Sequence, residues 1–309
     1  MPITLHFVRH AQGYHNLGAQ FHSLRDPALT PLGEKQCATL RSKLLDIYGV
    51  DPNKVTLVTA SPLIRTIHTA ALTFAETLAP GNRPTGKKME IMGLPTAQET
   101  SDYPCDTGSE PEVLKVACAK AGWPVDLRRV YADPDWIDKT PSSPYAPTNT
   151  KLKARARETR RILLREAKKL QAQTTRDVEV ALVTHGGLLH YLTEDWEDAN
   201  FGFGTGWKNT ELRSYTFVDE SDVNEAHLQE TSHSRAIRGK TAPMIPAGST
   251  GQETLFQATM RAWEDQGLET GASVERELGM GEDNYLERTM SQVSQNEMEA
   301  GGSRVMAAA

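Results

Sequence analysis

Short runs of apolar, β-branched residues recur along roughly the first two-thirds of the chain, and amphipathic stretches separate them. Runs of this length and composition favour buried strands. We therefore predict strands over residues 3–8, 55–59, 178–184 and 212–218, with a shorter one near 89–92.

The stretches between these runs carry helical signals. Thr30-Pro31 and Ser61-Pro62 each combine an N-cap residue with a proline at the first helical position. Further helices are predicted over Glu110–Ala121, over Lys151–Ala172 and after Gly186-Gly187. Strands that alternate with helices predict a doubly wound, mainly parallel α/β sheet with helices on both faces.

The pattern weakens in two places. Residues 123–149 are rich in proline and aromatic residues without a clear period, and we interpret them as an insertion over one end of the sheet. After about residue 222 the chain becomes polar, with one modest helical segment near 254–265. We assign residues 1–222 to the α/β domain and 223–309 to a partly ordered C-terminal extension.

Composition narrows the function classes. The chain has 34 Lys+Arg against 40 Asp+Glu, a net charge of −6, which disfavours nucleic-acid binding. Its three cysteines form no CxxC or Cys/His cluster and predict neither a zinc site nor a disulfide framework. No apolar run is long enough to span a membrane and no signal peptide is recognisable, so we expect a cytoplasmic protein. The sequence leaves the oligomeric state open.

Residues with side chains suited to catalysis follow directly after three of the predicted strands. Arg9-His10 follows the first strand, the segment Ser61–Arg65 follows the second, and His185 follows the strand over 178–184. In parallel sheets, ligands bind beyond the carboxyl ends of the strands. A neutral imidazole can attack phosphorus, arginines can bind the phosphoryl oxygens, and a carboxyl group can transfer the proton.

Five segments in order carry a resemblance to a known family: LHFVRHAQGYHN, LTPLGEKQC, TASPLIRTIHTA, LPTAQE and VTHGGLLHYL. Together they resemble the histidine phosphatase superfamily, in its phosphoglycerate-mutase-like branch. The resemblance implies a phosphatase that forms a phosphohistidine on His10 and acts on a small organic phosphate without metal or cofactor. It also implies that Arg9, Asn16, Arg65 and His185 bind the phosphoryl group and that Glu99 is the general acid/base.

Several alternatives stay open. Ala11 and Gly13 depart from the glycine and serine usual in the family's first motif, which affects the detail of the pocket. The same residues would serve a phosphomutase, and a non-catalytic member that binds a ligand or partner is the rival from another class. The general acid could instead be a carboxyl group near Glu99, and the candidates are Asp102, Asp106 and Glu110.

Some residues have a simpler explanation than function. A metal site at His6, His10 and His15 is disfavoured because Arg9 lies among them. Aromatic residues of the insertion could line a substrate pocket, although packing is the simpler explanation for Trp123, Tyr131 and Trp136.

Overall fold

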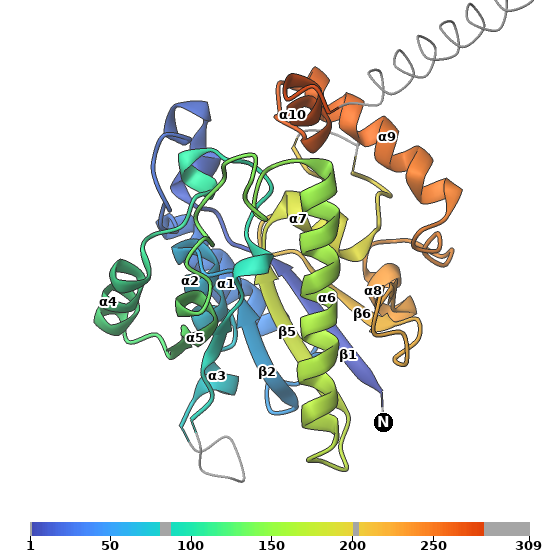
Figure 1. Ribbon diagram of the computed structural model, residues 1–309. Helices are drawn as coiled ribbons and strands as arrows, with labels where there is room; N and C mark the ends of the chain where they lie inside the picture. The colour runs from blue at the N-terminus through green and yellow to red at the C-terminus, as the bar shows by residue number, and fades with distance from the viewer. Residues whose placement is uncertain (1, 81–87, 200–203, 281–309) are drawn as a thin grey trace, which may run out of the picture.

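The computed structural model describes residues 2–80, 88–199 and 204–280, and these ranges contain a seven-stranded sheet in the order β4-β3-β2-β5-β1-β6-β7 (Figure 1). The five strands from β4 to β1 pair in parallel, whereas β6 and β7 are antiparallel to their neighbours. The strands are β1 (Ile3–Arg9), β2 (Val55–Ala60), β3 (Ile91–Gly93), β4 (Val125–Asp126), β5 (Val178–Thr184), β6 (Leu212–Phe217) and β7 (Leu228–Glu230).

Helices connect the strands and cover the sheet. Within the described ranges the α-helices are α1 (Pro31–Lys43), α2 (Ile64–Thr73), α3 (Ala75–Leu78), α4 (Pro111–Ala121), α5 (Arg128–Tyr131), α6 (Asn149–Gln171), α7 (Gly186–Thr193), α8 (Ser232–Ile237), α9 (Thr250–Asp265) and α10 (Gly271–Glu277). Short 3-10 helices lie at η1 (Tyr14–Leu17), η2 (Ala19–Phe21), η3 (Pro95–Ala97) and η4 (Pro104–Asp106). None of these helices is long and apolar enough to cross a bilayer.

The sheet separates two apolar layers. Successive side chains of a strand point to opposite faces, so β5 supplies Val180 and Leu182 to one layer and Ala181 and Val183 to the other. Helices α6, α7 and α9 contribute to the first layer, and α1, α2 and α4 to the second. Figure 1 shows α6 crossing in front of β5 and β1. The predicted doubly wound, mainly parallel sheet is confirmed.

The C-terminal extension packs on the α/β core in its described part. β7 pairs with β6, and α9 buries Phe256, Met260 and Trp263 in the layer that contains α6. Burial of an aromatic or Met side chain stabilises a fold by about 1.5–3 kcal/mol relative to exposure. The described extension therefore shares the hydrophobic core of residues 1–222, while residues 281–309 lie outside the described ranges.

The insertion over residues 123–149 contributes both to the core and to the edge of the sheet. Trp136 is fully buried, and a Cβ on Gly108 would come within 2.1 Å of its ring. Trp123 is partly buried against His68, at 4.6 Å between ring centroids, and Tyr131 is 44% exposed. These contacts favour packing over a substrate pocket for Trp136 and Trp123, whereas Tyr131 faces solvent.

Candidate active site

Three strand ends meet at the carboxyl edge of the sheet. β1 ends at Arg9, which pairs with Thr184 of β5, and β2 ends at Ala60, which pairs with Val183 of β5. This register brings His10, Ser61 and His185 to neighbouring positions. The sheet therefore gathers the three predicted segments at one rim, as expected for parallel strands.

His10 lies buried at the centre of this rim. Its Nδ1 is 2.7 Å from the backbone oxygen of Ala11, and its ring centroid is 5.2 Å from those of both His15 and His185. A carbonyl oxygen only accepts hydrogen bonds, so Nδ1 carries the proton and Nε2 keeps its lone pair. Burial, and then the charges of Arg65, His15 and Arg9, hold the pKa of His10 well below its usual value. The ring is therefore neutral at pH 7.

Arg65 is fully buried and held from two sides. It donates to Asp106 Oδ1 at 2.7 Å, to the Cys105 carbonyl at 2.6 Å and to His185 Nδ1 at 2.9 Å. Because arginine can only donate, His185 Nδ1 accepts, and His185 Nε2 donates to Ser61 Oγ at 2.9 Å. Burial, and then Arg65, lower the pKa of His185 well below its usual value.

Arg9 completes the positive side of the rim. One of its terminal nitrogens donates to the Trp207 carbonyl, while its Nε is buried without a hydrogen-bond partner among the described residues. The Nε of Arg65 is likewise buried without a hydrogen-bond partner among the described residues. Buried donors without partners cost free energy, so both guanidinium groups are suited to an incoming acceptor such as a phosphoryl oxygen.

The Glu99 side chain reaches the N-terminal turn of α7 from the loop after η3. Its carboxylate accepts backbone N–H bonds from Thr100 at 2.9 Å, Leu188 at 2.9 Å and Gly187 at 3.2 Å. Burial, and then Asp106, raise the pKa of Glu99, while Arg65 and the backbone amides oppose them. The site can therefore hold this carboxyl group protonated and also accommodate its ionised form.

Asn16, which the sequence predicts as a phosphoryl-binding residue, bonds to residues that neighbour His10. Its Oδ1 accepts from the Gly13 amide at 3.1 Å and from Asn209 Nδ2 at 3.4 Å, and its Nδ2 lies 3.1 Å from His15 Nε2. Asn209 also donates to the His10 carbonyl at 2.9 Å. Asn16 thus ties the loop after β1 to the ring that neighbours His10.

The carboxyl groups near Glu99 differ in burial and in their partners. Asp102 and Glu110 are exposed, and Glu110 caps α4. Asp106 is buried, paired with Arg65 and bonded by the Ser101 hydroxyl at 2.6 Å. Glu99 has a raised pKa and accepts backbone bonds from the helix that follows His185.

Three further residues belong to the site by contact, although the sequence analysis gave none of them its role there. His15, Ser61 and Asp106 all contact predicted site residues directly, and Ser61 lies within a motif already quoted. His6 bonds Ser214 and Glu179 within the sheet instead. In the part of the chain that the structure describes, no three His, Cys, Asp or Glu side chains are placed to hold a metal ion.

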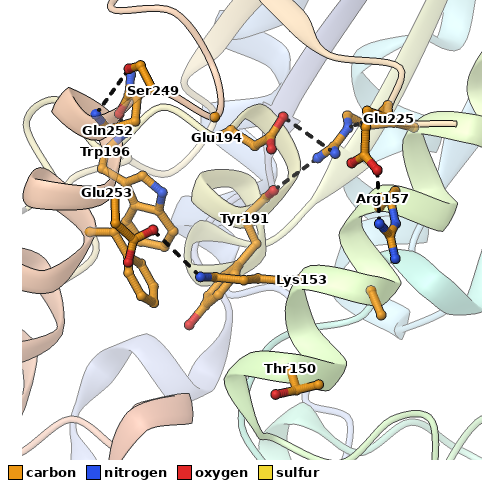
Figure 2. A pocket seen from close by; sticks show the side chains of 14 residues that line it. Thr150, Lys153, Arg157, Tyr191, Glu194, Trp196, Glu225, Ser249, Gln252 and Glu253 are labelled. Atoms are coloured by element: carbon orange, nitrogen blue, oxygen red, sulfur yellow. Dashed lines mark hydrogen bonds and ion pairs between the residues drawn. The ribbon is translucent and has the colours of Figure 1, made fainter. Parts of the chain in front are cut away.

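A separate cavity of about 520 Å³ lies between α6, the end of α7 and the start of α9 (Figure 2). Its cations are matched by carboxylates: Arg157 by Glu225 at 3.0 Å, Arg160 by Glu194 at 3.4 Å and Lys153 by Glu253 at 3.8 Å. The rim around His10 has an excess of positive groups instead. The charge balance therefore suits a phosphate better at the rim than in this cavity.

Comparisons with known proteins identify the family of the chain. The sequence model of a family described as the histidine phosphatase superfamily (branch 1) matches residues 5–82. A phosphoglycerate mutase-like protein of Arabidopsis thaliana is 30% identical over 262 residues, covering 74% of this chain and 90% of its own length. Phosphoglycerate mutase-like protein 1 of the same plant is 30% identical over 236 residues, covering 71% of this chain and 82% of its own length.

Among solved structures, a mycobacterial glucosyl-3-phosphoglycerate phosphatase aligns with a TM-score of 0.43 at 18% identity. It covers 74% of this chain and 96% of that protein. The family assignment follows from the two plant relatives, because each shares most of its length with this chain.

Proposed function

The chain belongs to the histidine phosphatase superfamily, and we propose that it is a phosphatase that hydrolyses a phosphomonoester through a phosphohistidine on His10. Nε2 of His10 attacks phosphorus while the bond to the leaving oxygen breaks, and Glu99 gives that oxygen its proton. Water then attacks phosphorus, Glu99 takes the proton of the water, and the N–P bond breaks. Phosphate leaves, and both residues return to their starting states.

The observation that carries this proposal is the tautomer of His10. The Ala11 carbonyl accepts the proton of Nδ1, and the neighbouring cations keep the ring neutral. The lone pair is therefore on Nε2 without any general base having to remove a proton. A buried imidazole of this kind among arginines is suited to attack an anionic phosphoryl group.

Positive charge supports the transition state. Phosphoryl transfer spreads negative charge over three equatorial oxygens, so catalysis depends on fixed cations and donors around them. Arg9 and Arg65 each keep a buried, unpartnered Nε in this region. Their guanidinium groups supply the charge that a metal ion provides in other phosphatases, and we propose that the reaction needs no metal.

Glu99 fits both proton transfers. Its raised pKa favours the protonated form that the first step requires. After Glu99 has given up the proton, its carboxylate still accepts hydrogen bonds from the three backbone amides around it. The same amides stabilise the base that the second step requires.

A direct test captures the intermediate. Enzyme mixed with ³²P-labelled substrate and quenched in alkali should carry acid-labile label, and His10→Ala should carry none and lose turnover. His15→Ala controls for the loss of an imidazole from the same site, since its ring centroid lies 5.2 Å from that of His10 but the ring supplies no attacking nitrogen in this proposal. Label or turnover that persists in His10→Ala excludes the mechanism.

A phosphomutase is the second candidate, and the names of the plant relatives favour it. A mutase returns the phosphoryl group to a second hydroxyl, whereas a phosphatase passes it to water. Free phosphate measured against isomerised product distinguishes the two. A non-catalytic member would release neither from p-nitrophenyl phosphate or a panel of phosphorylated metabolites. We further propose a cytoplasmic location, which is consistent with three buried free thiols and can be checked by fractionation.

A further inference from the structure

The ring of His15 has a polar atom that the fold itself does not use. His15 lies on η1, in the loop after β1, and is 9% exposed. Its ring centroid is 5.2 Å from that of His10, and its Nδ1 is buried without a hydrogen-bond partner among the described residues. An unpartnered buried polar group costs free energy that an apolar ring at this position would avoid. The mechanism proposed above assigns no role to this nitrogen.

The neighbouring hydrogen bonds determine which nitrogen of His15 carries the proton. Asn16 Oδ1 accepts from the Gly13 amide at 3.1 Å, and a backbone amide can only donate. Asn16 therefore presents its donor, Nδ2, to His15 Nε2 at 3.1 Å, so Nε2 accepts. Burial, and then the charges of Arg65 and Arg9, lower the pKa of His15 to about 2, which keeps the ring neutral at pH 7. The proton of the neutral ring is therefore on Nδ1, and the unpartnered atom is a donor.

Two other unpartnered donors lie around the same nucleophile. The Nε atoms of Arg9 and Arg65 are also buried without partners among the described residues. After burial, the largest influences on the pKa of His10 come from the same three side chains, Arg65, His15 and Arg9. A phosphoryl group in transfer has three equatorial oxygens on which negative charge develops. Three buried donors around His10 match that number.

Gly13 makes room for the Nδ1 edge of the His15 ring. A Cβ on Gly13 would lie 2.8 Å from both Cε1 and Nδ1 of His15, closer than a side chain can approach. The φ of Gly13 is −97°, so its backbone conformation does not require glycine. The edge of the imidazole thus occupies the volume that a side chain at position 13 would fill.

We propose that His15 binds a non-bridging oxygen of the transferring phosphoryl group through its Nδ1–H, as the third donor beside Arg9 and Arg65. The inference rests on the proposed phosphatase function and adds a substrate-binding residue to it. Each of the three donors then meets an oxygen whose charge grows in the transition state. His15 supplies a hydrogen bond and transfers no proton.

Two substitutions separate the donor of His15 from its shape. His15→Phe keeps a planar ring without the donor, and it should lower kcat/KM for p-nitrophenyl phosphate by about 10- to 100-fold, the value of one hydrogen bond to a charged group. His15→Asn should recover part of this loss, because its amide nitrogen, like Nδ1, is bonded to Cγ. His68→Phe is the matched control and should keep wild-type kinetics, since His68 packs on Trp123 at 4.6 Å between ring centroids.

Binding of inorganic orthovanadate, measured by calorimetry, tests the phosphoryl pocket without turnover. Its Kd should rise in His15→Phe by a factor similar to the loss in kcat/KM, and should stay at the wild-type value in His68→Phe. The label on His10 should still form in His15→Phe, because the attacking nitrogen is unchanged. Thermal unfolding of each variant verifies that it is folded.

A relocated donor provides a second check. His15→Ala empties the volume beside Gly13, and an added Gly13→Ser then brings a hydroxyl into it. The double variant should bind orthovanadate more tightly than His15→Ala alone. Gly13→Ser in the wild-type background should instead weaken binding, because its Cβ forces the ring of His15 to move. A double variant that binds no more tightly than His15→Ala would contradict the proposal.

The outcomes separate this inference from the proposed function. If hydrolysis depends on His10 but His15→Phe keeps the wild-type kcat/KM or the wild-type Kd for orthovanadate, His15 is not a phosphoryl ligand and the phosphatase stands. Equal losses in His15→Phe and His15→Asn would show that the shape of the ring matters and not its donor, which also overturns the inference. If the wild type hydrolyses no phosphomonoester but His15→Phe still weakens orthovanadate binding, the phosphatase fails and the role of His15 stands.

Discussion

A single methyl group at Gly187 should displace Glu99, the proposed general acid, while leaving His10, the proposed nucleophile, in place. Gly187 is the second residue of α7, and its amide donates to Glu99. A Cβ built on it would lie 2.8 Å from both Glu99 Oε1 and Thr100 Oγ1. Gly187→Ala therefore pushes the carboxylate away from the helix that binds it.

The size of the effect follows from these distances. Ordinary contact begins at 3.4 Å, so the carboxylate has to move by about 0.6 Å. The move weakens two charge-assisted bonds, from the amides of Gly187 and Leu188, each worth about 1.5–3 kcal/mol. A misplacement of about 1 Å costs roughly 10²-fold in rate, and we expect a loss of about 10- to 100-fold in kcat/KM for an alkyl phosphate.

The choice of substrate makes the assay specific for the acid. An alkoxide needs a proton in order to leave, whereas p-nitrophenolate leaves without one. Gly187→Ala should therefore lose far more activity on glycerol 2-phosphate than on p-nitrophenyl phosphate. Gly251→Ala is the matched control, because Gly251 is also the second residue of a helix and its Cβ meets only Ile245 Cγ2 at 3.1 Å and Ser249 Oγ at 3.7 Å.

A double-mutant comparison completes the argument. If Gly187→Ala acts through the carboxyl group, it should add little to the loss already caused by Glu99→Gln. Equal losses on the two substrates, full additivity with Glu99→Gln, or wild-type activity in Gly187→Ala would each show that Glu99 is not the acid.

Other predictions concern stability. Asp106→Ala leaves Arg65 buried without its carboxylate, which costs about 3 kcal/mol and should lower Tm by roughly 5–10 °C and raise KM, as read by calorimetry and kinetics. Trp263→Ala should cost about 3–5 kcal/mol with little change in kcat, and an unchanged Tm would mean that the extension does not share the core. Four buried histidines have lowered pKa values: His10, His15, His185 and His190. In the unfolded chain they take up protons near pH 6.5, whereas in the folded protein they stay neutral. Their contribution to stability is therefore fully present above about pH 6.5 and is lost as pH falls. Tm should therefore fall between pH 7 and pH 5, although Glu269, whose pKa is raised to about 7, acts in the opposite direction; a rising Tm would contradict the prediction.

The central strands and the residues that follow them were predictable because their signals are local. An apolar run such as VEVALVT can only be buried, and parallel pairing then brings its end to the ends of its neighbours. Arg9, His10 and His185 directly follow such runs. Their meeting is a consequence of strand register and needs no knowledge of side-chain contacts.

The support around Arg65 was not predictable in the same way. Asp106 lies 41 positions away, on a 3-10 helix with no periodic pattern, and it was one of several nearby carboxyl groups. The packing of the C-terminal extension was also not evident from its composition. Its polar average hides a stripe of Phe256, Met260 and Trp263 at helical spacing along α9, which a search by period would have found.

The glycine pair after His185 links the two halves of the site. A Cβ on Gly186 would lie 2.3 Å from Thr205 Oγ1 and 3.2 Å from Arg9 Nε, and one on Gly187 would meet Glu99. Neither glycine has a positive φ, so backbone freedom does not explain them. What they provide is close approach: one turn of α7 packs against Arg9 on one side and Glu99 on the other. The glycine pair therefore fixes the distance between the proposed phosphate-binding arginine and the proposed acid, which no single side chain in the motif could set.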